Sequence, residues 1–256
     1  MRKRQKLVLT SLALSLGLLA VQSVGLEIRY LLIGFLAGVS WLLAAWSLKE
    51  GLSGIEWLTV TLPSVLFTAA VGLFYILLPQ AWTARLSIAV IFGIGQYALL
   101  LTGNIFSVAA IRTIALFRAA SAVGFVMALI TGFFIFDTIL SFRFDFWLVG
   151  LLVFVTGFLL LVPALWSVEL LPVISKRVWK YSFWSAVSLG FLAVSICFWP
   201  ISISVASLFL STILYVVLGI TQHYFSERLF PRTVGEYVTV GVVVTITMLA
   251  TAGWGV

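Results

Sequence analysis

Long apolar segments recur along the chain and are separated by short polar stretches. Each segment has about 20 residues, near the length that an α-helix needs to cross the hydrocarbon core of a bilayer. Apolar and polar residues do not alternate within the segments, so the pattern predicts helices rather than strands. We expect nine membrane-spanning helices, over residues 7–25, 30–48, 56–78, 84–103, 114–140, 146–167, 181–199, 201–222 and 233–254.

Three parts of this pattern need interpretation. Residues 104–113 are expected to form a short interfacial stretch before the fifth helix. Residues 181–222 are about twice as long as one span, and Pro200 interrupts their middle, so we expect a tight hairpin of two helices. The basic residues before Leu7 and the apolar run after it resemble a signal peptide. Small residues are poorly placed for cleavage near Gln22, so we expect an uncleaved anchor helix.

Composition identifies the solvent of these helices. The chain is 63% hydrophobic and 9% charged, whereas a soluble domain is about half apolar and about a quarter charged. These values predict an all-α polytopic integral membrane protein, located in the plasma (inner) membrane if the source is prokaryotic. Its net charge of +7 is spread over separate loops, which does not fit a nucleic-acid partner. The expected partner is the lipid bilayer, with a membrane-protein partner or a homo-oligomer left open.

The distribution of cations predicts the orientation. With the N-terminus in the cytoplasm and the C-terminus outside, 12 of the 15 lysines and arginines fall on the cytoplasmic side, as the positive-inside rule requires. The three on the outside are Arg29, Arg85 and Arg143. Tryptophans are expected at the membrane interfaces near helix ends; they are Trp57, Trp82, Trp147, Trp166, Trp179, Trp184, Trp199 and Trp254.

The two halves of the chain share short words about 120 residues apart. Residues 44–48 (AAWSL) return as 164–168 (ALWSV), 102–107 (TGNIFS) as 221–226 (TQHYFS), and 112–114 (RTI) as 232–234 (RTV). Each pair of words falls at an equivalent place in the predicted topology, although shared composition also allows chance matches.

This echo predicts a single membrane domain over residues 1–256 that contains two repeats. An anchor helix over residues 1–28 precedes a four-helix repeat over 29–143 and a second over 144–256. A unit with an even number of helices keeps its orientation, so the 4+4 repeat should be parallel.

The repeat also ranks the polar residues. Arg118 and Glu236 fall at similar depths on matching helices and form a candidate intramembrane ion pair; the alternative is that Arg118 reaches lipid phosphates while Glu236 lies among headgroups. Candidate cytoplasmic helix-end residues related by the repeat are Asn104, Arg112, His223 and Arg232.

Two further polar residues are expected to have structural roles. Gln96 is the candidate mid-membrane polar residue, and its glycine neighbours favour helix packing over a substrate contact. Asp137 is expected at the outer surface, near Arg85 or Arg143.

Catalytic patterns are weak. Residues 51–54 (GLSG) match the Gly-x-Ser-Gly of rhomboid proteases, but His223 lies too far along the chain for the compact spacing of that family. No metal-ligand motif or phosphate-binding loop is found, so no catalytic residue, metal or cofactor is predicted. Duplication favours a small transporter-like or lipid-handling protein with an apolar or lipidic substrate. The alternative is a non-catalytic subunit or scaffold, and an intramembrane enzyme is the least favoured class.

Overall fold

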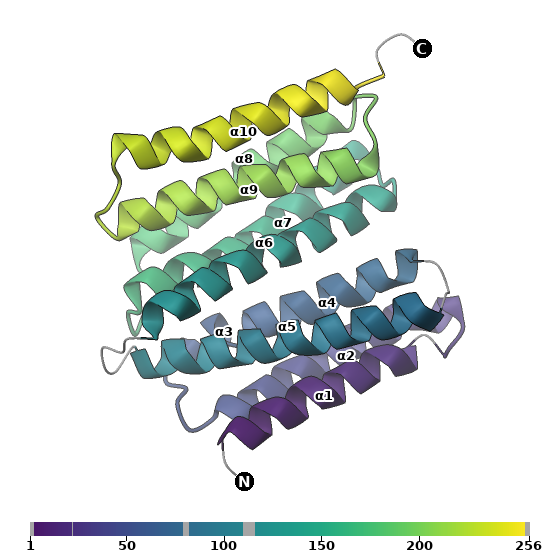
Figure 1. Ribbon diagram of the computed structural model, residues 1–256, viewed down its shortest axis with the longest axis vertical. Coiled ribbons are helices and arrows are strands. Elements are labelled where there is room, and N and C mark those ends of the chain that lie inside the picture. The colour runs from purple at the N-terminus through teal and green to yellow at the C-terminus, as the bar shows by residue number, and fades with distance from the viewer. Residues whose placement is uncertain (1–2, 22, 79–81, 110–115, 254–256) are drawn as a thin grey trace. The chain divides into compact units, whose positions relative to one another are not determined.

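The computed structural model describes residues 3–21, 23–78, 82–109 and 116–253, which form helices joined by turns (Figure 1) and contain no strand. The helices are α1 (Lys3–Val21), α2 (Leu26–Leu48), α3 (Glu56–Thr59), α4 (Leu62–Leu77), α5 (Trp82–Ala109), α6 (Phe117–Ser141), α7 (Phe146–Glu169), α8 (Lys176–Ile196), α9 (Ile203–Phe225) and α10 (Pro231–Thr251).

Eight spans in the described part of the chain are long and apolar enough to cross a membrane, with α3 and α4 counted together as one. The long helix outside this set is α8, whose 21 residues include three cations and four serines. In a bilayer, backbone polar groups must be satisfied within the protein, and helices do this internally. The chain is therefore an all-helical, multi-pass integral membrane protein.

The chain divides into two compact units, and the division falls inside α6. Unit 1 comprises residues 1–131 and 170–173, and unit 2 comprises residues 132–169 and 174–256. In unit 1, α1 packs against α2 and α5, and α4 packs against the same two helices. These contacts link the four helices into a closed ring. Its core holds fully buried Leu14, Phe92 and Tyr75.

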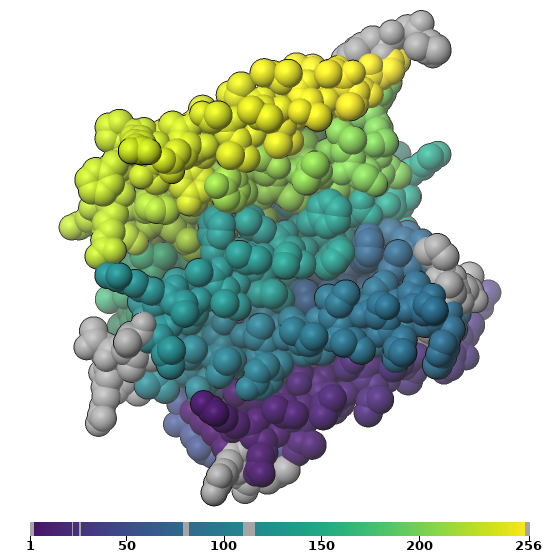
Figure 2. All heavy atoms as spheres, viewed as in Figure 1, coloured from purple at the N-terminus to yellow at the C-terminus, as the bar shows by residue number. Residues whose placement is uncertain are grey.

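In unit 2, α7, α8 and α9 pack against one another in pairs, and α10 packs against α9. The core of this three-helix group includes Leu161, Trp166 and Leu189. Trp166 is buried, so its side chain packs within this core, and its predicted depth near a membrane interface stays a prediction. By contrast, α10 leaves most of its apolar side chains exposed along the surface of unit 2 (yellow in Figure 2).

Helix boundaries correct the predicted pattern in two places. The third predicted span is interrupted at residues 60–61, before Pro63 in the first turn of α4. The fourth continues through Asn104 to Ala109, so the described part of the stretch 104–113 belongs to this helix and is not a separate stretch before the fifth. The hairpin predicted at Pro200 is confirmed, because α8 ends at Ile196 and α9 begins at Ile203.

Candidate functional site

Gln96 lies in the core of unit 1, at the contact between α5 and α4. Its side chain is fully buried, and its amide nitrogen donates a hydrogen bond to the hydroxyl oxygen of Ser64. Its amide oxygen is also buried and has no hydrogen-bond partner among the described residues. A buried acceptor left unpaired costs about 1–3 kcal/mol. Gln96 therefore joins two helices and leaves one acceptor open.

Close packing surrounds this amide. A methyl group built on Gly95 would lie 2.7 Å from Cζ of Phe67, and one built on Gly93 would lie 3.4 Å from the side chain of Ser15. The Ser15 hydroxyl donates to the carbonyl oxygen of Ala89 at 2.6 Å, which ties α1 to α5. These contacts agree with the packing role predicted for Gln96.

The repeat-related helix-end residues have different surroundings. Asn104 is half-buried within α5, and its side-chain oxygen has no hydrogen-bond partner among the described residues. His223 lies in the last turn of α9, with Nδ1 at 2.8 Å from the carbonyl oxygen of Gly219. Its ring centroid is 5.6 Å from that of Tyr237. Arg112 lies outside the described residues.

Arg118, Arg232 and Glu236 are all exposed. Oε1 of Glu236 lies 3.4 Å from Nε of Arg232, one helical turn away on α10. An exposed pair of this kind contributes about 0.3–0.5 kcal/mol. Arg118 belongs to unit 1 and Glu236 to unit 2. The ion pair between Arg118 and Glu236 therefore stays a prediction.

Asp137 corrects a further expectation. It lies near the end of α6, but its side chain is buried rather than exposed at the outer surface. Oδ1 accepts a hydrogen bond from the hydroxyl of Ser207 on α9 at 3.1 Å. Ser207 and Ser211 are four residues apart and so share one face of α9. This spacing was the signal in the sequence for a polar contact on that face.

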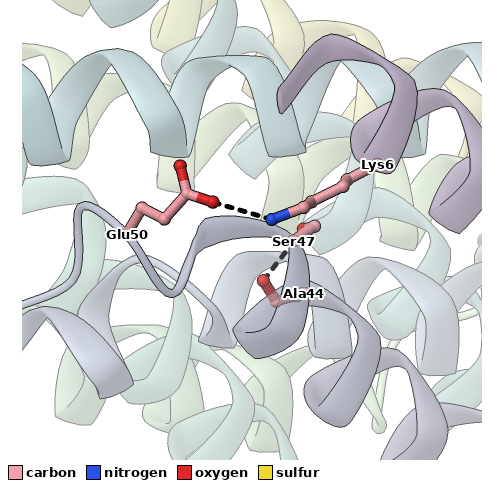
Figure 3. Close-up of polar contacts among 4 residues, drawn as sticks. All are labelled: Lys6, Ala44, Ser47 and Glu50. Carbon is pink, nitrogen blue, oxygen red and sulfur yellow. Dashed lines mark hydrogen bonds and ion pairs between the residues drawn. The ribbon is translucent and has the colours of Figure 1, made fainter. Parts of the chain in front are cut away.

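An ion pair joins the beginning of α1 to the turn after α2 in unit 1. Nζ of Lys6 lies 2.7 Å from Oε1 of Glu50 (Figure 3), and it also lies 5.7 Å from the ring centroid of Trp46. The hydrogen bond from Lys6 lowers the pKa of the Glu50 carboxyl below its ordinary value. Because Glu50 is exposed, this is a surface salt bridge that contributes little to the stability of the fold.

Unit 2 has an open apolar groove between α7 and α8, with a volume of about 440 Å³. The groove lies where two glycines face each other. A methyl group built on Gly190 would lie 2.8 Å from the carbonyl oxygen of Gly150 and 3.0 Å from Cβ of Phe154. Its lining residues are all apolar: Trp147, Gly150, Leu151, Phe154, Val187, Gly190, Phe191 and Val194.

Aromatic side chains continue from this groove along both helices. The ring centroids of Phe154 and Phe183 lie 5.7 Å apart, and those of Phe158 and Trp179 lie 5.5 Å apart. Phe183 and Trp179 are both exposed. The groove and these rings therefore form one apolar strip on the α7–α8 face. This strip escapes sequence reasoning because it depends on the way the two helices pair.

The described residues contain no cluster of three or more histidine, cysteine, aspartate or glutamate side chains that could hold a metal ion. Their features are instead helix-packing polar groups and an apolar groove. Together with the eight candidate spans, they define the class as a multi-pass helical membrane protein with an apolar surface groove.

Within this class, the chain belongs to the family described as "Protein of unknown function (DUF5656)", whose model matches residues 49–251. The match includes the groove and every candidate site residue predicted from the sequence. No curated protein and no solved structure matches the chain.

Proposed function

We propose that this protein handles lipids in the membrane and holds a hydrocarbon chain in the groove between α7 and α8. The observation that carries the proposal is the groove itself, whose lining offers no charged, hydroxyl or amide side chain. Such a lining can solvate a hydrocarbon chain but no ion or sugar. A helix of about 10 Å in diameter needs far more room than about 440 Å³. One lipid chain is therefore the occupant that fits best.

A bulky side chain at Leu151 tests this proposal. Leu151 lines the groove and is exposed, so Leu151→Trp fills the groove without disturbing the core. The full chain is reconstituted in phosphatidylcholine vesicles that contain a phosphatidylcholine probe with a photoactivatable acyl chain. Mass spectrometry should locate adducts on the groove residues, and Leu151→Trp should reduce these adducts several-fold.

Leu208→Trp is the matched control, because Leu208 is an equally exposed leucine of unit 2 that does not line the groove. It should leave labelling of the groove unchanged. Adducts spread evenly over all exposed helices, with no effect of Leu151→Trp, would contradict the proposal.

The proposal includes nine membrane spans, with a cytoplasmic N-terminus and an external C-terminus. Support for the ninth span comes from α8, which has 21 residues and packs against both α7 and α9. At 1.5 Å per residue, such a helix is about 30 Å long, which matches the hydrocarbon core. Its cations lie within its first five residues, where they can reach one membrane surface.

The parallel repeat is also part of the proposal. In the first repeat α2, α4 and α5 are mutually in contact, as are α7, α8 and α9 in the second. The matching segments 44–48 and 164–168 have similar hydrogen bonds. The Ser47 hydroxyl donates to the carbonyl oxygen of Ala44 at 2.9 Å, and the Ser167 hydroxyl donates to that of Ala164 at 2.8 Å.

Two further correspondences support the repeat. Thr102 and Thr221 are 5% and 8% exposed, and Phe106 and Phe225 are 8% and 7% exposed, so matched positions face the interior alike. The repeat limits, 29–143 and 144–256, and the Arg118–Glu236 pair are retained within this proposal.

A non-catalytic subunit or scaffold is the second candidate function. It is favoured by α10, whose apolar face is almost entirely uncovered by the described residues. A partner helix on α10 would protect that face from a lipid-borne photoactivatable probe, whereas a lipid-facing α10 would be labelled along its length.

A further inference from the structure

We infer that the apolar strip on the α7–α8 face binds an anionic phospholipid, whose headgroup lies at Lys176 and Lys180. This inference rests on the proposed function, because it assigns a chemical class to the lipid whose chain occupies the groove. It adds a polar end to a site that is otherwise apolar.

The two lysines lie exposed at the beginning of α8. No described carboxylate forms an ion pair with either of them, and the first turn of α8 contains no acidic residue. A helix N-terminus already carries a partial positive charge, so cations placed there are unfavourable unless an anion joins them. The beginning of α8 therefore has a surplus of positive charge.

Arg177 is the third cation of this turn, but its side chain is engaged within unit 2. Its guanidinium lies 4.5 Å from the ring centroids of both Tyr224 and Phe225 on α9. Its Nη2 donates to the carbonyl oxygen of Tyr224 at 3.4 Å. Lys176 and Lys180 are thus the cations left available to a ligand.

The lysines share a helix face with the groove. Lys176, Lys180, Val187, Gly190 and Val194 follow one another at intervals of four, seven, three and four residues, which keeps them on one side of an α-helix. The last three of these residues line the groove. The exposed ring of Trp179 lies between the two lysines along α8, and the exposed ring of Phe183 lies between Lys180 and the groove residues. A ligand with one anionic end and one hydrocarbon end would match this order of side chains.

The length of the strip agrees with one lipid leaflet. Lys180 and Gly190 are ten residues apart on α8, which is about 15 Å along the helix axis. Half of the hydrocarbon core of a bilayer is also about 15 Å thick. A headgroup at Lys180 therefore places Trp179 at the level of the headgroup and the hydrocarbon chain beside Phe183, with its end in the groove.

The charge of the lysines selects among headgroups. A zwitterionic headgroup neutralises its phosphate with its own ammonium group, whereas an anionic headgroup brings a net negative charge to the lysines. One lysine close to an anionic membrane surface favours binding of an anionic lipid over a zwitterionic one by about fivefold. Two lysines together should give roughly a tenfold to thirtyfold preference for the anionic lipid.

Two photoactivatable lipids with identical acyl chains test this preference, one a phosphatidylglycerol and the other a phosphatidylcholine. Each is added in trace amount to phosphatidylcholine vesicles that contain the full chain, and adducts on the groove residues are counted. The phosphatidylglycerol probe should label the groove at least tenfold more. The double variant Lys176→Gln/Lys180→Gln should bring this ratio close to one and leave labelling by phosphatidylcholine unchanged.

The matched control is Arg228→Gln/Arg232→Gln, which removes two exposed cations of unit 2 that lie outside the strip. It should preserve the preference for the anionic probe. Equal labelling of the groove by both probes in the unaltered protein overturns the inference and leaves the proposed function standing. Absence of label from the groove with both probes overturns the proposed function as well.

Discussion

At the scale of single residues, the buried amide of Gln96 shows why a polar side chain can lie within a membrane helix. It donates to Ser64 and leaves its oxygen unpaired. The two partners are therefore not equivalent. Removing the hydroxyl of Ser64 leaves the buried amide of Gln96 without a hydrogen-bond partner at either its nitrogen or its oxygen. Removing the amide of Gln96 leaves the Ser64 hydroxyl, which can instead donate to a carbonyl of its own helix.

This asymmetry predicts the effects of two substitutions. Ser64→Ala should lower the free energy of unfolding by about 1–3 kcal/mol, because a buried polar group is left unpaired. Gln96→Leu should change it by less than about 1 kcal/mol, since an apolar group of similar size replaces the amide. Denaturant titration of the protein in detergent measures both values, with Ser64→Ala/Gln96→Leu as the third variant. A larger loss for Gln96→Leu than for Ser64→Ala would contradict this account of the pair.

Only part of the polar chemistry at this scale could be predicted from the sequence. Gln96 stands out because an amide is rare in an apolar run, but Ser64 does not, because serine is common in membrane helices and usually bonds to its own backbone. Asp137 illustrates the same limit. Its depth along α6 follows from the sequence, whereas its burial depends on which helix faces it, and that face carries Ser207.

At the scale of helices, the apolar pattern predicts the positions of the long helices well. Each needs about 20 apolar residues to cross the bilayer, and this requirement leaves a strong signal. The ends are less clear, because a helix can continue past the apolar run. Such a continuation extends α5 to Ala109. The break between α3 and α4 has a weak signal, since Pro63 is also compatible with the first turn of a helix.

The position of Cys197 tests whether α8 crosses the membrane. Cys197 is exposed in the turn after α8, and in the nine-span topology it faces the outside. A membrane-impermeant maleimide should therefore label it in intact cells. Partial burial of the sulfur raises the pKa of this thiol, so the labelling rate should increase at alkaline pH, where more thiolate is present.

The chain has one cysteine, which allows a matched control. In Cys197→Ser/Ser226→Cys the thiol moves to the turn after α9, on the proposed cytoplasmic side. It should react only after the cells are permeabilised. The opposite result for the two positions would contradict the nine-span topology.

At the scale of the whole molecule, the proposed repeat can be predicted from the sequence, whereas the groove can be found only once the pairing of helices is known. The echo of short words is visible in the sequence and agrees with similar contacts around Ser47 and Ser167. The groove has no such signal. Gly150 and Gly190 are ordinary residues of membrane helices until α7 and α8 are paired, and only their close approach brings the walls of the groove together.

The central claim is that a lipid chain occupies the groove on α7 and α8. A high-resolution structure of the full chain in a lipid nanodisc tests it most directly. We expect an ordered hydrocarbon chain beside Phe154 and Phe191, with an anionic headgroup near Lys176 and Lys180. A groove closed by a protein helix, or lipid no better ordered there than along α10, would contradict the account.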